Sequence, residues 1–233
     1  VMIAGGAEAA ICEIGIAGFN ACKALSTGHD EDPTKASRPW DANRDGFVMG
    51  EGSGMVIIET LEHALARGAT PLAEVTGYGS SCDAYRITDI QPEGRGAAVA
   101  MGEALRQAGI DPNARGPHGR PPIHYISAHG TGTKENDSIE TIGVKRVFGE
   151  LAPSIPMSSI KSMMGHLIAA AGAVEFITCV QSIRHGMLPP TMLVAPTTAS
   201  PPSVSASASS FPPPFWTDRA APTLPRRWAI PAS

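Results

Sequence analysis

Residues 158–175 read SSIKSMMGHLIAAAGAVE and combine the end of a strand, a tight turn and the start of an apolar helix. Residues 156–160 are short and partly apolar and are bounded by a glycine turn, a pattern that indicates a strand. The helical stretch that follows is apolar on nearly every side, with Glu175 as its only charge, so we expect it to be buried. Lys161 and His166 then stand at the mouth of this helix. Its exposed amides and dipole favour a neutral imidazole there, and neutral His166 is a hydrogen-bond donor for developing negative charge.

A second stretch, residues 126–133, reads ISAHGTGT and has the same order of features. An apolar strand ends at His129, a Gly-Thr turn follows, and a helical pattern begins. In open α/β folds ligands bind beyond the carboxyl ends of strands, so we expect His129, His166 and Lys161 to converge on one pocket. Each residue alone is more often a helix cap or a solvated side chain. The matching pair of stretches is what favours a catalytic interpretation.

Together these stretches resemble the β-ketoacyl-acyl-carrier-protein synthases of the thiolase superfamily, in particular the elongating type II enzymes. The resemblance extends from residue 1 to about residue 191 and follows the order of that family. Further motifs that carry it are VMIAGGAE at 1–8, SRPWD at 37–41, RDGFVMGEG at 44–52 and DAY at 83–85. The resemblance implies an incomplete α/β thiolase-like fold with layers in the order α-β-α-β-α. The chain would hold the end of the N-terminal half and most of the C-terminal half.

The resemblance implies a decarboxylating Claisen condensation in fatty acid or polyketide biosynthesis. A cysteine thiolate takes an acyl chain from acyl carrier protein, malonyl-carrier protein loses carbon dioxide, and the resulting enolate attacks the acyl thioester. On this reading His129 and His166 donate hydrogen bonds to the malonyl thioester oxygen, and Lys161 is the positive charge that orders them. Glu175 is expected to compensate Lys161, because an unpaired buried charge is costly.

Other residues are implied to support this chemistry. Thr131 and Thr133 are candidates for hydrogen bonds to the amides of the phosphopantetheine arm. Asp137 and Glu140 lie one helical turn apart and are expected to form a polar network behind the histidines. For those two, a helix cap and a solvated carboxylate are equally good interpretations. No metal and no cofactor is expected, because the substrate arrives on the arm of acyl carrier protein. That protein and a second copy of the chain are the implied partners.

The nucleophile of the family is missing from the matched motifs. It would precede the motif that opens this chain, and no nucleophile motif surrounds the cysteines that are present, Cys12, Cys22, Cys82 and Cys179. We therefore expect a chain that cannot perform the condensation by itself. One alternative is a non-catalytic partner subunit of the chain-length-factor type. The presence of both histidines and the lysine argues against it, because a subunit without catalytic activity need not keep them. Another is a CoA-dependent thiolase-like enzyme, although the motifs fit carrier-protein synthases better.

The overall composition excludes several classes of function. Charged residues make up 17% of the chain and the net charge is −4, which argues against nucleic acid or anionic membrane as a partner. No apolar run is long enough to span a bilayer, and the chain does not open with the charged region of a signal peptide. The four cysteines lack metal-ligand or redox spacing and indicate reduced thiols in a cytoplasmic protein.

Strand and helix patterns alternate along the chain, which predicts a mostly parallel sheet covered by helices. The predicted strands are 55–60, 73–77 and 123–128, and the predicted helices are 61–67, 95–108 and 138–148, the last capped by Asp137. Residues 26–47 form a long polar loop, which is usually functional. We assign residues 1–190 to the synthase-like domain. Residues 191–233 are rich in Pro, Ser and Ala, and we expect a disordered tail or the product of a shifted reading frame.

Overall fold

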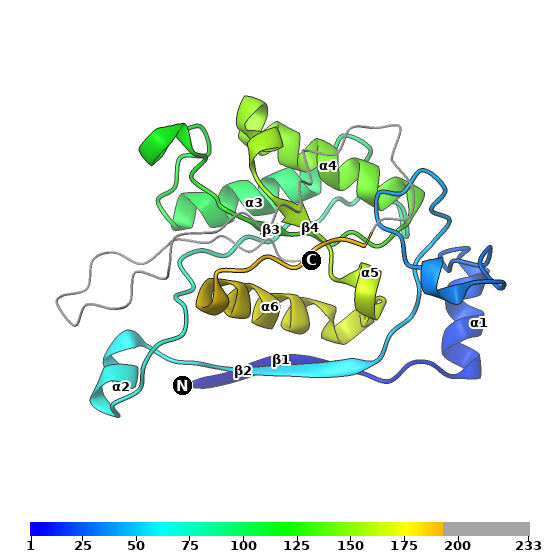
Figure 1. The fold of residues 1–233 in the computed structure, drawn as a ribbon, viewed down its shortest axis with the longest axis horizontal. Helices are drawn as coiled ribbons and strands as arrows, with labels where there is room; N and C mark the ends of the chain where they lie inside the picture. Colours follow the sequence, from blue (N-terminus) through cyan, green and yellow to red (C-terminus); the bar gives the residue numbers. More distant parts are fainter. Residues whose placement is uncertain (193–233) are drawn as a thin grey trace.

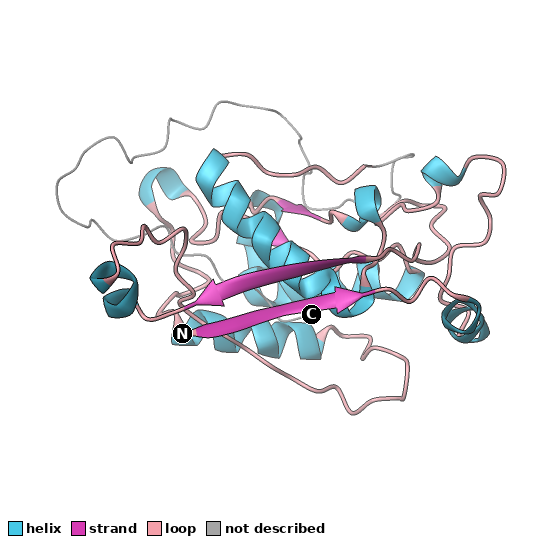
Figure 2. Ribbon diagram, turned by 90° about the horizontal axis from the view of Figure 1, so that it is seen from below, coloured by secondary structure: helices cyan, strands magenta, loops and turns pink. Residues whose placement is uncertain are grey.

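The computed structural model describes residues 1–192. The predicted tail at 191–233 therefore lies outside the described residues from residue 193 onward. The described elements stack in four layers (Figure 1). They are the strands β1 (Met2–Glu8) and β2 (Gly52–Ile58), helix α6 (Ala171–His185), the strands β3 (Ile126–Ser127) and β4 (Met157–Ser158), and helices α3 (Arg95–Gln107) and α4 (Lys134–Phe148). This order matches four layers of the expected α-β-α-β-α stack. Among the described residues no helix covers the outer face of the β1–β2 pair. This face points toward the viewer in Figure 2.

The longer strand pair joins β1 (Met2–Glu8) to β2 (Gly52–Ile58). The two strands are antiparallel, with Ile3 opposite Ile57 and Gly5 opposite Met55. Period-two alternation places these four residues on one face, away from α6. Ile3 and Ile57 are 75% and 67% exposed, so this face is both apolar and uncovered by residues 1–192.

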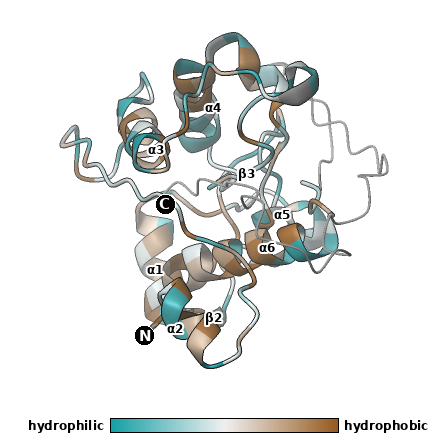
Figure 3. Cartoon of the chain, turned by 90° about the vertical axis from the view of Figure 1, so that its left-hand side faces the viewer, coloured by the Kyte–Doolittle hydropathy of each residue, from teal (hydrophilic) through white to brown (hydrophobic). Residues whose placement is uncertain are grey.

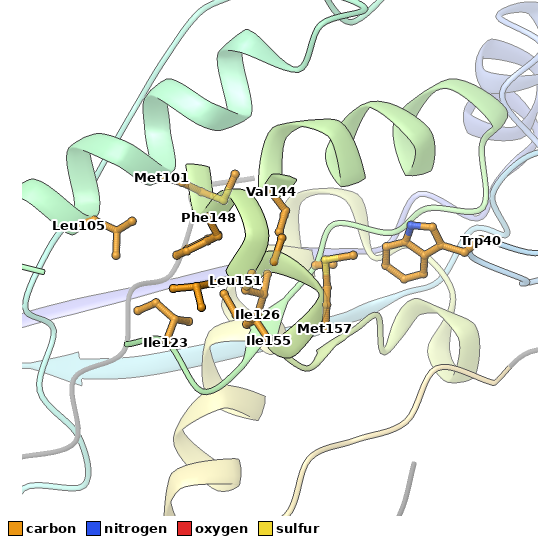
Figure 4. Close-up of a cluster of buried hydrophobic side chains, with 12 residues drawn as sticks. Trp40, Met101, Leu105, Ile123, Ile126, Val144, Phe148, Leu151, Ile155 and Met157 are labelled. Carbon is orange, nitrogen blue, oxygen red and sulfur yellow. The ribbon is translucent and has the colours of Figure 1, made fainter. Parts of the chain in front are cut away.

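The shorter pair is parallel and lies beneath the main hydrophobic core. It joins β3 (Ile126–Ser127) to β4 (Met157–Ser158), and the helices α3 (Arg95–Gln107) and α4 (Lys134–Phe148) cover it. Figure 4 shows side chains of both helices meeting those of the strands and of the segment before β4. The cluster includes Met101, Leu105, Ile123, Ile126, Val144, Phe148, Leu151, Ile155 and Met157. Full burial of one such side chain stabilises the fold by about 1.5–3 kcal/mol.

Helix α6 (Ala171–His185) lies between the two strand pairs. The predicted helix starts later than expected, because α5 (Lys161–Met164) and a 3-10 turn at Ile168–Ala170 come before it. Its fully buried residues form a stripe at helical spacing: Ala171, Glu175, Cys179 and Ser182. Figure 3 shows apolar colouring along much of α6 and a more mixed pattern on α3 and α4. Helix α6 is thus apolar because it lies between the β1–β2 and β3–β4 strand pairs.

The remaining elements are short. They are α1 (Glu13–Ala21), α2 (Leu61–Ala66) and 3-10 turns at Pro33–Lys35, Pro117–Gly119 and Gly149–Ser154. No helix among the described residues is both long and apolar enough to cross a membrane.

Three predictions about these elements were wrong. Residues 73–77 are not a strand, because within the described part of the chain they have no neighbouring strand to bond with. The sheet is not mostly parallel, since the seven-residue pair is antiparallel and the parallel pair has two residues in each strand. Helix α4 begins at Lys134 and not at Ser138. Thr133 is its cap, with a side chain that accepts a hydrogen bond from the Asn136 amide.

Candidate functional site

The two stretches singled out in the sequence meet at one place. Because β3 and β4 are parallel, their carboxyl ends lie at the same edge, and His129 and Lys161 each follow one of them within three residues. His166 comes in after the short helix α5. The imidazole rings of His129 and His166 lie edge to face, with centroids 5.1 Å apart and planes at 86°. The structure therefore brings the three predicted catalytic residues together.

Lys161 is held almost completely inside the protein, with 2% of its side chain exposed. Its Nζ donates to the carbonyl oxygen of His129 at 2.7 Å and to the carboxylate of Glu175, which belongs to the buried stripe of α6. Burial raises the pKa of Glu175, and the adjacent ammonium opposes that rise. The ion pair is thus the compensation expected for Lys161, and it anchors the backbone of His129.

His166 is fixed in one tautomer by its own neighbours. Its Nδ1 accepts a hydrogen bond from the Ile168 amide at 3.0 Å. A neutral imidazole that accepts at Nδ1 carries its proton on Nε2, so the other nitrogen is a donor. Burial, with a contribution from Lys161, lowers the pKa of His166 to about 4. Ile168 has a φ of 44°, a strained conformation for a β-branched residue, at the turn that makes this contact.

His129 is held through its backbone. Its amide donates to Oε1 of Glu140 at 2.7 Å, and the Gly130 amide donates to Oε2 of the same carboxylate at 2.9 Å. Burial, followed by the nearby Lys161 and His166, lowers the pKa of His129 to about 3. Its Nδ1 is buried and has no hydrogen-bond partner among the described residues. Both imidazoles are therefore neutral at physiological pH.

Glu140 is not the solvated carboxylate that was one interpretation of its position. It binds two successive backbone amides of the turn after β3, and burial raises its pKa to about 7. The turn itself requires glycine at position 130. Gly130 has a φ of 39°, and a Cβ there would lie 2.5 Å from the Cβ of Ser159. The predicted polar network behind His129 is thus present at Glu140.

Asp137 is not the cap of α4, because it lies inside the first turn of that helix. Its Oδ1 accepts a hydrogen bond from the Gly132 amide at 3.2 Å, and its Oδ2 lies 3.4 Å from Nε of Arg44. Arg44 also donates to the carbonyl oxygen of Thr133 at 3.0 Å. Burial raises the pKa of Asp137, while these donors and the guanidinium oppose that rise. Asp137 therefore fastens the loop of Arg44 to the start of α4.

The two predicted phosphopantetheine-binding threonines are engaged with each other. Their hydroxyl oxygens are 2.9 Å apart, and that of Thr133 also caps α4. Thr131 is buried and Thr133 is half-buried. Their contact with a substrate arm stays a prediction.

Sequence reasoning missed residues of the long loop that touch the site. The Phe47 ring packs on His166 with centroids 5.1 Å apart, and the Phe19 ring packs on Phe47 at 5.3 Å. The Ser37 hydroxyl donates to the carbonyl oxygen of Lys161 at 2.5 Å. The available signal was the length of the loop at 26–47 together with the motifs at 37–41 and 44–52. It indicated function without indicating which side chains would point inward.

The four cysteines occupy exposed and buried positions. Cys12, Cys22 and Cys82 are exposed. Cys179 is buried one turn after Glu175, and burial raises its pKa to about 11, which keeps the thiol protonated. Within residues 1–192 no cluster of three or more His, Cys, Asp or Glu side chains could hold a metal ion.

Comparison with known proteins matches two family models. Residues 1–64 match the N-terminal domain of the beta-ketoacyl synthases, and residues 72–195 match their C-terminal domain. The 3-oxoacyl-[acyl-carrier-protein] synthase 2 of Rhizobium meliloti is 54% identical over 192 residues, which are 82% of this chain and 44% of that protein. The chloroplastic synthase II of Arabidopsis thaliana is 48% identical over 190 residues, 82% of this chain and 33% of that protein. The chain thus spans less than half the length of these curated relatives.

Solved structures give the same picture. A beta-ketoacyl synthase from Burkholderia phymatum is 38% identical with a TM-score of 0.76, covering 87% of this chain and 46% of that one. A type II polyketide ketosynthase, solved with its acyl-carrier protein, is 41% identical with a TM-score of 0.75, covering 82% of this chain and 45% of that one. The predicted thiolase-like α/β fold, present in part, is confirmed.

Proposed function

The chain belongs to the beta-ketoacyl synthase family, and from that premise we propose that it carries the malonyl-activating part of a 3-oxoacyl-acyl-carrier-protein synthase. The pathway would be fatty acid or polyketide biosynthesis. The observation that carries the proposal is the pair of neutral imidazoles, 5.1 Å apart at their centroids, beside a buried lysine. A non-catalytic partner subunit is not favoured, since such a subunit has no need of this arrangement.

In the proposed step the bond between the malonyl carboxylate and the α-carbon breaks and carbon dioxide leaves. The electron pair moves onto the thioester oxygen, which becomes an enolate. Nε2–H of His166 donates to that oxygen, and the ring N–H of neutral His129 donates to it as well. Preorganised donors of this kind stabilise developing charge more than water does. The enolate carbon then attacks an acyl thioester and displaces its thiolate.

The surrounding residues have supporting roles in this proposal. Lys161 holds the His129 backbone and adds to the effect of burial in keeping both imidazoles unprotonated, and Glu175 neutralises Lys161. Thr131 and Thr133 face the phosphopantetheine arm of acyl carrier protein, the proposed substrate carrier. No metal or cofactor takes part. A homodimer and a cytoplasmic location belong to the same proposal.

The test is release of carbon dioxide from malonyl-carrier protein by the full chain. We expect catalysed release, and a drop of about 10²–10³-fold for His129→Ala and for His166→Ala, the usual cost of one lost donor. His63→Ala is the matched control, because His63 is an exposed histidine paired with Glu59 on the surface. It should retain full activity. A folded chain that releases no carbon dioxide, or histidine variants as active as the control, would refute the proposal.

A further inference from the structure

Trp40 has a conformation that its place in the core does not explain. It lies in the long polar loop, yet its side chain is buried at one end of the main cluster, beside Met157 (Figure 4). Its φ is 61°, in the left-handed region that bulky residues avoid. Strained conformations of this kind persist only where surrounding contacts enforce them, and they concentrate at functional sites.

Three hydrogen bonds enforce the conformation of Trp40. Its backbone amide donates to Oδ2 of Asp137 at 2.8 Å. Its indole Nε1–H is shared between the carbonyl oxygen of Asp137 at 3.1 Å and the hydroxyl of Thr141 at 3.2 Å. The indole is therefore fixed to the first turns of α4 at both its backbone and its ring.

The far edge of the indole reaches the turn that carries His129. A Cβ added to Gly130 would lie 2.7 Å from Cη2 of Trp40, so the ring packs directly on that backbone. On other sides the same turn is held by the Glu140 carboxylate, which binds two of its amides, and by the Ser159 hydroxyl, which donates to the Gly130 carbonyl at 2.7 Å. The indole thus supplies an apolar surface against which the turn packs.

We propose that Trp40 is a positioning residue for the histidine pair. By bracing Gly130 against α4, the indole sets the orientation of His129 toward His166 and keeps water out of the space between them. The titratable groups around His129 are Lys161, His166 and Glu140, whose carboxylate binds the His129 amide, and the hydrogen bonds of Trp40 go to Asp137 and Thr141 instead. The expected effect of Trp40 on carbon dioxide release rests on the proposed function. Its expected effect on the orientation of His129 does not depend on that function.

The test uses two variants of the full chain and one control. Trp40→Phe keeps an aromatic ring and removes the indole donor. Thr141→Val removes one acceptor and leaves the ring untouched, so it tests the same link if Trp40→Phe fails to fold. Phe148→Leu is the control, because Phe148 is buried in the same cluster and belongs to the other end of α4. Each of the three variants loses a packing contact or a hydrogen bond. Only Trp40→Phe and Thr141→Val are expected to loosen the turn at Gly130.

Two measurements distinguish positioning from simple stability. The first is the titration of the His129 and His166 imidazoles by NMR. The test variants should raise the pKa of His129 by one unit or more toward its ordinary value, as water enters, and the control should not. The second is carbon dioxide release, in which kcat should fall about tenfold to a hundredfold with little change in KM.

Unchanged imidazole titrations in folded Trp40→Phe and Thr141→Val would overturn the proposal, and so would equal shifts in Phe148→Leu. If the unmodified chain releases no carbon dioxide, the proposed function fails. The imidazole titrations would then still decide the positioning role of Trp40.

Discussion

Replacing Lys161 by methionine tests the electrostatic reasoning about the site most directly. The side chains of Lys161 and Glu175 are 2% and 9% exposed, and the ammonium contacts both the Glu175 carboxylate and the His129 carbonyl. Methionine keeps the length and the apolar stem and removes the charge. The Glu175 carboxylate is then left buried without its cation.

The expected cost follows from that unpaired charge. Removing one partner of a buried ion pair costs about 3–5 kcal/mol. In a chain of this size each kcal/mol lowers the midpoint of thermal unfolding by about 2–4 °C, so a fall of roughly 6–20 °C is expected. The double variant Lys161→Met/Glu175→Leu removes both charges. It should lose only about 1–3 kcal/mol, the cost of leaving the His129 carbonyl without its donor.

The pH dependence supplies a second, independent check. Without Lys161, burial raises the pKa of Glu175 further above its unfolded value. A group with a raised folded pKa contributes stability below its unfolded pKa and loses it as pH rises through the folded pKa. The deficit of Lys161→Met should therefore grow between about pH 5 and about pH 7, by up to about 2.7 kcal/mol. The double variant should lose the part of this growth that comes from Glu175, and the remainder reflects the two histidines, whose pKa values Lys161 also helps to lower.

The assay is urea or thermal unfolding of the single variant, the double variant and the unmodified chain at both pH values. A deficit that does not change with pH would refute the claim that Glu175 is the source of the cost. A double variant as unstable as the single one would refute it as well. Either result would mean that the cost comes mainly from the lost hydrogen bond between the Lys161 ammonium and the His129 carbonyl.

Two further predictions concern packing and association. A Cβ on Gly79 would lie 1.8 Å from the Ala100 carbonyl oxygen of α3, so Gly79→Ala should cost about 1–3 kcal/mol in unfolding experiments. Gly102→Ala, on the same helix with open space around it, should instead stabilise by up to about 1 kcal/mol, and equal effects would contradict the packing argument. The exposed apolar face at Met55 and Ile57 should make the chain associate in light scattering, and Ile57→Lys should reduce this. A monodisperse, cooperatively melting unmodified chain would contradict that expectation.

Local signals predicted several elements well. The helices expected at 61–67 and 95–108 are Leu61–Ala66 and Arg95–Gln107, because capping and periodicity are properties of neighbouring residues. The start of α4 was missed because Asp is intrinsically a better cap than Thr, whereas the folded chain uses Thr133. The strand expected at 73–77 failed for another reason, since pairing depends on a partner strand that is distant in sequence.

The same division holds at the site. His129, His166 and Lys161 could be predicted because each follows a strand or turn with a recognisable pattern. Glu140 could not be distinguished from a solvated carboxylate, because its two amide partners become visible only when α4 folds against the turn after β3. Trp40 lies in the motif at 37–41, but nothing in that motif indicated its role, since its partner Asp137 is 97 residues away in the sequence.

The site depends on contacts between the two regions that the family models match. The second region, residues 72–195, supplies both histidines and Lys161. The first region, residues 1–64, supplies the Phe47 ring against His166 and the Val48 carbonyl, which accepts from the His166 amide at 2.7 Å. Burial is the largest cause of both lowered histidine pKa values, and the first region provides part of that burial. Neutral imidazoles are therefore a property of the two regions packed together, and neither motif stretch alone would produce them.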